Sequence, residues 1–382
     1  MRARWAGGVA GTMSSSRRIC FIVERQVGIG SAAMAIEPHV RSRPNTDWTD
    51  VTYTQPGGLI ERLRLPARLG GPLAGFLQTG AALRRGPFES LFFLTHNPAV
   101  MRQDAVARTP TLLWTDVTPA LLDAQARDYE HKVDSSRLVR AMKKAMVRRT
   151  LHRASLCVGW SEWARRSLVS DYGVPEERTA VVPPGIDLSR WQLPERSHKT
   201  GTPRLLFVGG DFERKGGRAL LDVFRSHLRG RVELDIVTRG VLQEEEGVRV
   251  HRGLDPGSAP LLDLYRNASA FVLPTRADCF SIASIEAMAM GLPVVVSGVG
   301  GIPEIVDPGR TGFLLDPSDG RELRQAVESL LADPEAARAM GLRARLVVEE
   351  RFDAKKTAER LFALLSSIAQ KNKDAIKARA SA

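Results

Sequence analysis

Cysteine, histidine and long apolar runs are scarce in this chain, and each scarcity excludes a class of protein. The 382 residues contain three cysteines that lie far apart with no CxxC pair, so a disulfide framework is not expected. The seven histidines form no HExxH or HxxxH pattern, so the sequence predicts no metal site. No apolar run approaches the roughly 18 residues of a membrane-spanning helix. No nucleic-acid-binding motif is present, so nucleic acid is not an expected partner.

Acidic residues are scarce relative to basic ones, but only in the first half of the chain. Residues 1–180 contain 26 lysines and arginines against 16 acids, whereas the remaining residues contain 29 against 27. A basic half indicates an anionic partner such as a membrane surface, a phosphorylated acceptor or nucleic acid. Hydrophobic residues make up 43% of the chain, which is enough for the cores of the two domains that this length predicts.

Short apolar runs alternate with helical segments throughout the chain, which predicts an α/β fold with parallel, doubly wound sheets. Two runs in the first half, "SLFFLTHNPAV" and "PTLLWTDVTPA", end in the polar residues His96 and Asp116. Carboxyl ends of parallel strands line ligand crevices. The expected parts are a tail (1–16), a first domain (17–185), a linker (186–202), a second domain (203–352) and a C-terminal helix and tail (353–382).

The stretch "TRADCFSIASIEAMAMGLPVVVS" contains a carboxylate that is isolated on an apolar helix. Ser281 is a suitable N-cap, so the backbone amides around residues 279–283 would favour a phosphate. Glu286 lies over one turn further along, and Asp278 precedes the helix. An ionised carboxylate only accepts hydrogen bonds, which suits the vicinal hydroxyls of a sugar. The alternative is that Glu286 pairs with an arginine and Asp278 is a surface acid.

A second stretch, "LLFVGGDFERKGG", also joins a strand to a helix. Gly209 and Gly210 permit close backbone approach, and Arg214 and Lys215 could neutralise a diphosphate. Taken alone, a solvated basic turn explains this stretch equally well. Two helix starts suited to anions within one domain, one of them beside a pair of acids, favour a nucleotide-sugar site.

At these residues the sequence resembles the retaining nucleotide-sugar glycosyltransferases of family 4. The resemblance covers about Asp116 to Leu315 and is carried by "YRNASAFVLPTRADCFSIASIEAMAMGLPVVVSGVGGIPEIVDPGRTGFLL" and "VVPPGID". It implies the GT-B fold, in which two Rossmann-like domains face a central cleft and a C-terminal helix crosses back to the first domain. It also implies that Glu286 binds the ribose, that Asp278 faces the transferred sugar and that Lys215 binds the diphosphate. The implied amide donors are Cys279, Phe280, Ser281 and Ile282.

Three positions depart from the family pattern. Asp278 stands where a glutamate is usual. Gly210 stands where an arginine is usual, and Arg214 could substitute from the loop. Thr115 precedes Asp116 where a histidine is common, and His96 is a candidate replacement on the acceptor side.

The activity implied by the resemblance is transfer of a hexose, with retention of configuration, from a UDP- or GDP-linked sugar to a hydroxyl of a glycan, glycolipid or small molecule. No metal and no further cofactor are expected, and the expected location is the cytoplasm, with peripheral contact at the inner membrane surface. One alternative is a basic protein that binds anionic membranes or nucleic acid and keeps a vestigial donor site. Another is a phosphorylase of the same architecture.

Two weaker features lie in the first half. Gly28 and Gly30 follow a predicted strand and could hold a phosphate across the cleft, but a packing turn explains them equally well. Residues 135–154 form a basic amphipathic helix. We expect it to pack its apolar stripe on the sheet; docking on an anionic membrane is the alternative.

Overall fold

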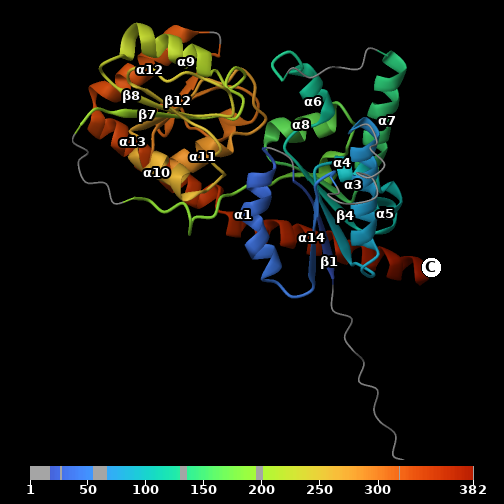
Figure 1. The fold of residues 1–382 in the computed structure, drawn as a ribbon. Coiled ribbons are helices and arrows are strands. Elements are labelled where there is room, and N and C mark those ends of the chain that lie inside the picture. The colour runs from blue at the N-terminus through green and yellow to red at the C-terminus, as the bar shows by residue number, and fades with distance from the viewer. Residues whose placement is uncertain are drawn as a thin grey trace, which may run out of the picture.

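The computed structural model describes residues 18–25, 28–54, 67–129, 136–194, 201–317 and 319–381. The predicted tail (1–16) and residues 195–200 of the predicted linker lie outside this part of the chain. Within it, the chain forms two units, each built on a six-stranded sheet of parallel strands (Figure 1). This is the predicted doubly wound α/β class.

The strands of the first unit are β1 (Ile19–Glu24), β2 (Thr46–Val51), β3 (Ser90–Leu94), β4 (Thr111–Thr115), β5 (Leu156–Gly159) and β6 (Thr179–Val181). They are arranged in the order β2-β1-β3-β4-β5-β6. Its helices are α1 (Gly30–Arg41), α3 (Ala67–Leu83), α4 (Asn97–Val100), α5 (Gln103–Arg108), α6 (Pro119–Ala124), α7 (Arg137–Arg153), α8 (Glu162–Ser170) and η1 (Glu176–Arg178).

The strands of the second unit are β7 (Arg204–Val208), β8 (Glu233–Val237), β9 (Val248–His251), β10 (Ala270–Leu273), β11 (Val294–Ser297) and β12 (Gly312–Leu315). They are arranged in the order β12-β11-β10-β7-β8-β9. The helical segments are α9 (Gly217–Val223), η2 (Phe224–Leu228), α10 (Ala259–Asn267), α11 (Ile282–Ala289), η3 (Ile302–Glu304), α12 (Gly320–Ala332), α13 (Pro334–Arg351) and α14 (Ala354–Ala380).

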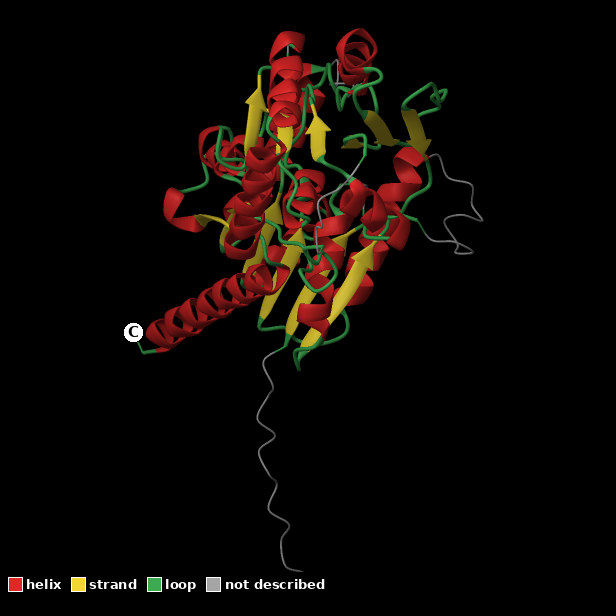
Figure 2. Cartoon of the chain, turned by 90° about the vertical axis from the view of Figure 1, so that its left-hand side faces the viewer, coloured by secondary structure: helices red, strands yellow, loops and turns green. Residues whose placement is uncertain are grey.

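The central strands are short and apolar because helices cover both faces of each sheet (Figure 2). Every residue of β3, β4, β10 and β11 is buried, as expected for parallel strands enclosed on two sides. The strand order reverses between β1 and β3 in the first sheet and between β7 and β10 in the second. Ligand crevices of doubly wound sheets form at such reversals, at the carboxyl ends of the strands.

The last helix, α14, crosses back to the first unit, as the resemblance implied. It packs on α1, β3 and β4 and runs across that unit in Figure 1. The two segments that join the units pair with each other: the Ile186 amide donates to the Phe352 carbonyl over 2.9 Å, and the Ala354 amide donates to the Ile186 carbonyl over 3.0 Å. Within the predicted C-terminal helix and tail (353–382), the helix extends to Ala380.

A carboxylate of the second unit joins the two units at the cleft. Glu304 accepts hydrogen bonds from the backbone amides of Glu162 and Trp163 over 2.7 and 2.9 Å. These amides begin α8, where a negative charge is stabilised by the helix dipole. Next to this contact the Trp160 ring meets the edge of Phe280, with centroids 6.2 Å apart. The carboxyl ends of the two sheets therefore face each other.

The basic helix predicted over residues 135–154 is α7, but its expected packing is wrong in one respect. Only Val147, Thr150 and Leu151 are buried on this helix, whereas Leu138 and Met142 at its beginning are 70% and 57% exposed. The apolar stripe therefore faces away from the sheet along most of the helix. None of the helices within the described ranges is both long and apolar enough to cross a membrane.

We predict that Glu304→Ala loosens the contact between the two units. Loss of two charge-assisted hydrogen bonds at a helix start should lower the free energy of unfolding by about 1–3 kcal/mol. It should also increase the radius of gyration measured by small-angle X-ray scattering. Glu350→Ala, at an exposed site on α13, serves as the control and should change neither value. An unchanged melting temperature in Glu304→Ala would contradict this role.

Candidate donor site

Two loops meet at the strand reversal of the second sheet, and together they contain most of the predicted donor-site residues. One runs from Gly209, at the end of β7, to the start of α9. The other follows β10 and leads into α11. Gly216 joins them: its φ is +80°, and a Cβ there would lie 1.8 Å from the Pro274 carbonyl oxygen. Only glycine accommodates both the left-handed backbone and this close approach.

The side chains of Lys215 and Asp278 meet across these two loops. The Lys215 ammonium donates to Asp278 Oδ2, and the two side chains are 16% and 8% exposed. The neighbouring Arg214 donates to the Ala277 carbonyl over 2.7 Å and pairs with Asp211 over 3.2 Å. The alternative of a solvated basic turn with a separate surface acid is therefore wrong. The structure brings a cation and a carboxylate together where the two loops meet.

The start of α11 offers backbone donors beside this ion pair. Ser281 caps the helix by accepting from the Ser284 amide over 3.3 Å. Within the described residues, the amides of Ile282 and Ala283 make no hydrogen bond to another backbone carbonyl. Behind them, Gly300 has a φ of +56°, and a Cβ there would lie 1.9 Å from the Asp278 carbonyl oxygen. The sequence analysis missed this support, although "GVGG" after a strand was the available signal.

Glu286 is almost enclosed, with 7% of its surface exposed. The Tyr265 hydroxyl donates a hydrogen bond to Glu286 Oε2 over 3.0 Å. In the described part of the chain no arginine pairs with Glu286, so the alternative of an arginine pair is wrong. Burial raises the pKa of Glu286 to about 8, partly offset by the Tyr265 hydrogen bond. Tyr265 is itself held by the edge of Trp191, at 5.2 Å between ring centroids. The carboxyl therefore has unused acceptor capacity in a largely buried position.

A second arginine lies where the family arginine is absent. A Cβ on Gly210 would lie 2.9 Å from Arg239 Nε, so the guanidinium of Arg239 occupies the space beside this glycine. The side chain is exposed, and the Arg239 backbone amide donates to the Gly210 carbonyl over 3.3 Å. Arg239 follows β8, and no local pattern connected it to the site. Arg214, the substitute predicted from the sequence, faces the other loop instead.

The first unit contributes further carboxylates at the opposite side of the cleft. Asp116 follows β4, and burial raises its pKa to about 7, with the negative charges of Glu24 and Asp278 acting in the same direction. Burial lowers the pKa of His96 to about 4, so this ring is neutral at pH 7. Glu24, at the end of β1, was not predicted; the Thr95 hydroxyl donates to it, and burial raises its pKa.

His96 and Asp116 share one cleft of about 990 Å³, lined also by residues of α3, α4, α6 and α7. The cleft places the predicted acceptor residues on one surface. Gly28 and Gly30 lie where α1 begins; Gly28 has a φ of +93°, and Ile29 between them also lines the cleft. Their predicted role as a phosphate loop stays a prediction.

A tyrosine of the first unit contacts both donor loops. The Tyr129 hydroxyl lies 3.2 Å from Cys279 Sγ, and the Arg214 guanidinium lies 4.3 Å from the centre of the Tyr129 ring. Asp128 next to it pairs with Arg276 over 3.7 Å. Two donor-site residues therefore contact the first unit, which links the donor loops to the relative position of the two units.

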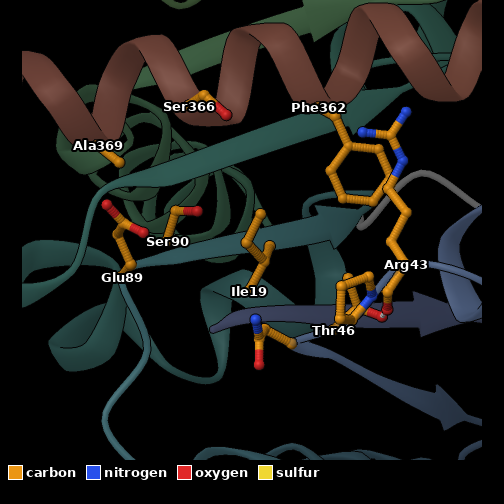
Figure 3. A pocket seen from close by; sticks show the side chains of 10 residues that line it. Ile19, Arg43, Thr46, Glu89, Ser90, Phe362, Ser366 and Ala369 are labelled. Atoms are coloured by element: carbon orange, nitrogen blue, oxygen red, sulfur yellow. Dashed lines mark hydrogen bonds between the residues drawn. The ribbon is translucent and has the colours of Figure 1, made fainter. Parts of the chain in front are cut away.

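A separate cavity lies at the other end of the first sheet and is not part of this site. It measures about 460 Å³ and is lined by the beginnings of β1, β2 and β3 and by Phe362, Ser366 and Ala369 of α14 (Figure 3). In the picture the Arg43 side chain reaches the Phe362 ring, at 4.1 Å from guanidinium to ring centre. None of the predicted site residues lines it.

Two family models match the chain, one on each unit. The model described as Glycosyltransferase Family 4 matches residues 81–190, and the model described as Glycosyl transferases group 1 matches residues 202–333. The glycogen synthase of Mycobacterium tuberculosis is 35% identical over 186 residues, 45% of this chain and 44% of that protein. The D-inositol 3-phosphate glycosyltransferase of Nocardia farcinica is 31% identical over 204 residues, 47% and 45% of the two chains. These matches span less than half the length of the relatives.

Solved structures match over nearly the whole chain. Sucrose-phosphate synthase from Thermosynechococcus elongatus has a TM-score of 0.71 at 18% identity and covers 92% of this chain and 99% of its own. HepE of Anabaena in complex with UDP has a TM-score of 0.70 at 17% identity and covers 92% and 100%. These similarities show the fold. The two family models match both units, so the chain belongs to the glycosyltransferases, and the solved structures show that its fold is GT-B.

Proposed function

We propose that this protein transfers a hexose from a nucleoside diphosphate sugar to a hydroxyl acceptor, with retention of the anomeric configuration and without a metal ion. The observation that carries the proposal is the arrangement around α11. A lysine–aspartate pair and free backbone amides lie at the start of the helix, and a nearly enclosed carboxyl with acceptor capacity follows one turn later. A ligand with phosphates in the middle and a sugar at each end matches this arrangement.

In this proposal each donor-site group has one task. Glu286 accepts hydrogen bonds from the two ribose hydroxyls. The amides of Ile282 and Ala283, Lys215 and Arg239 surround the diphosphate and stabilise its charge as it leaves. Asp278, released from Lys215 when phosphate binds, accepts hydrogen bonds from the transferred hexose. The cations here supply the charge that a metal ion supplies in other transferases.

The transfer step breaks the bond between the anomeric carbon and the diphosphate oxygen and forms a bond to the acceptor oxygen on the same face. The proton of the acceptor hydroxyl passes to the departing phosphate oxygen. Until this transfer, Asp116 accepts the hydrogen bond of that hydroxyl, and neutral His96 contacts the acceptor beside it, which lowers the entropic cost of the reaction. Closure of the two units excludes water and limits hydrolysis of the donor.

The names of the related proteins support this assignment. HepE of Anabaena is described in complexes with UDP and with UDP-glucose, which makes a UDP-linked hexose the first donor to test and a GDP-linked sugar the second. We also place the protein in the cytoplasm, in peripheral contact with the inner membrane surface. A basic binding protein with a vestigial donor site is the competing function. It would bind anionic vesicles or oligonucleotides in a salt-dependent manner, without turnover.

A thermal-shift screen across nucleoside diphosphate sugars tests the proposal directly. A donor present at 100 times its dissociation constant should stabilise the native state by about 2.7 kcal/mol and raise the melting temperature. When a stabilising donor is incubated with the protein and an extract that contains acceptors, we expect the nucleoside diphosphate to be released. A protein that is stabilised by none of these sugars would not be a transferase of this kind.

Glu286→Gln should weaken binding of the donor and of the nucleoside diphosphate by roughly 10- to 100-fold, because a charged acceptor of two hydroxyls is lost. Isothermal titration calorimetry measures this loss. Glu350→Gln, on α13, is the control and should bind as the native protein does. If the two variants bound the donor with equal affinity, Glu286 would have no role in donor binding.

The raised pKa of Glu286 also predicts that donor binding releases a proton at pH 7. The hydroxyl donors favour the ionised carboxylate, so affinity should rise with pH until about 8. Calorimetric titrations in two buffers of different ionisation enthalpy measure the number of protons released.

The raised pKa of Glu286 also affects stability. Without ligand, the folded protein binds this proton more tightly than the unfolded chain does. Stability should therefore decline as pH rises from about 4.5 to about 8, and Glu286→Gln should reduce that decline.

Lys215→Ala and Arg239→Gln should separate recognition of the diphosphate from recognition of the nucleoside. Each variant should weaken nucleoside diphosphate binding by roughly tenfold or more while leaving the affinity for the nucleoside unchanged, since the lost charge faces phosphate. Lys355→Ala, at an exposed position on α14, is the control. If Arg239→Gln binds the diphosphate normally, the residue beside Gly210 has no part in the site.

A further inference from the structure

Helix α7 exposes an apolar stripe that no described part of the chain covers. Leu138, Met142 and Met146 follow one another at intervals of four residues and are 70%, 57% and 48% exposed; Val139 beside them is 39% exposed. Residues at this spacing lie on one face of a helix. Helices of globular proteins normally turn such a face to the core, and a contiguous exposed apolar surface indicates a binding partner.

The charge of α7 identifies the kind of partner. The helix contains seven lysines and arginines and no acidic residue. Arg148 and Arg149 are exposed at its centre, and the Lys144 ammonium lies 5.8 Å from the centre of the Tyr172 ring. A second copy of this helix would repel the first, because both are positive. An apolar stripe beside concentrated positive charge matches the interface of an anionic bilayer.

The same helix forms a wall of the acceptor cleft. Met146, at the end of the stripe, lines the cleft of about 990 Å³ together with His96 and Asp116. Helix α3 also lines it, through Gly71 and Pro72, and the neighbouring Phe76 is exposed. Met146 therefore connects the exposed stripe of α7 with the cleft that contains Asp116, the carboxylate that we assign to the acceptor.

We propose that the acceptor is a membrane lipid with a hydroxyl-bearing head group, and that α7 lies in the interface of an anionic bilayer while this head group occupies the cleft. The inference rests on the proposed function, because it names the acceptor of that transfer. The apolar stripe of α7 enters the acyl boundary, and its arginines and lysines contact anionic head groups. The lipid hydroxyl then reaches Asp116 without leaving the membrane surface, and its oxygen forms the new bond to the hexose.

Sedimentation with vesicles tests the docking. The full chain should bind vesicles of phosphatidylglycerol and phosphatidylcholine, less strongly as salt increases, and should bind phosphatidylcholine vesicles far more weakly. The double variant Leu138→Glu/Met142→Glu should lose roughly tenfold or more of this binding, since two apolar side chains leave the interface. Leu346→Glu, at a site 62% exposed on α13, is the control and should bind as the native protein does.

Two further double variants test the contribution of positive charge to vesicle binding. Arg148→Gln/Arg149→Gln should weaken binding to anionic vesicles by roughly 30-fold, as each basic residue near the surface contributes about 1 kcal/mol. Lys371→Gln/Lys377→Gln removes the same charge from exposed sites on α14 and should have little effect. Equal losses in both pairs, or a concentration-dependent dimer that Leu138→Glu/Met142→Glu abolishes, would overturn membrane docking by α7.

The acceptor class is tested with a donor labelled in the hexose and total lipid from the expression host, presented in the anionic vesicles. The label should enter the organic phase, and Leu138→Glu/Met142→Glu should reduce that product roughly tenfold while its affinity for nucleoside diphosphate stays native. Label found only in water-soluble products would overturn the lipid acceptor and leave the transferase intact. Failure of the native protein to bind any nucleoside diphosphate would instead overturn the proposed function.

Discussion

The hydrogen-bonded contact of Glu304 joins the two units at the point where their candidate site residues approach each other. Glu304 of the second unit accepts from two amides at the start of α8 in the first unit, where the helix dipole and the free N–H groups both favour a carboxylate. The donor loops belong to the same unit as Glu304, and the strand ends that carry Asp116 and His96 belong to the same unit as α8. Asp116 belongs to the first unit and Asp278 to the second. Because the units are in contact, the negative charge of Asp278 helps to raise the pKa of Asp116.

In the candidate donor site an ion pair already occupies the two groups that a ligand would bind. Lys215 and Asp278 are paired and mostly buried, and breaking a pair of this kind without replacing its partners is costly. A phosphate can take over the lysine, and sugar hydroxyls can take over the aspartate. A ligand that supplies both groups meets the requirement, whereas phosphate alone leaves the aspartate without a donor. Under the proposed function, the pair therefore favours the complete nucleotide sugar over its fragments.

Local patterns predicted the parts of the site that local structure builds. The strand β10, the cap at Ser281 and the helix α11 follow from an apolar run, a suitable N-cap and a glycine stop within about twenty residues. The contacts that complete the site join distant segments: Tyr265 with Glu286, and Arg239 with Gly210. No spacing within one segment encodes these contacts, because they depend on how β8 and α10 pack. For α7 the periodicity revealed a stripe, but which way the stripe faced depended on the rest of the fold.

The enclosed position of Glu286 connects stability with binding. A carboxyl in this environment is protonated more readily than in water, so the unliganded protein holds a group in an unfavourable ionised state whenever the pH exceeds its pKa. Replacing Glu286 by an apolar residue would relieve this cost, yet it would leave the ribose without an acceptor. Hydroxyl donors remove the cost in the bound state, because they solvate the carboxylate in place of water. In the proposed complex, part of the binding free energy therefore comes from removing a cost that burial of Glu286 introduces, and two adjacent hydroxyls at that depth are suited to remove it.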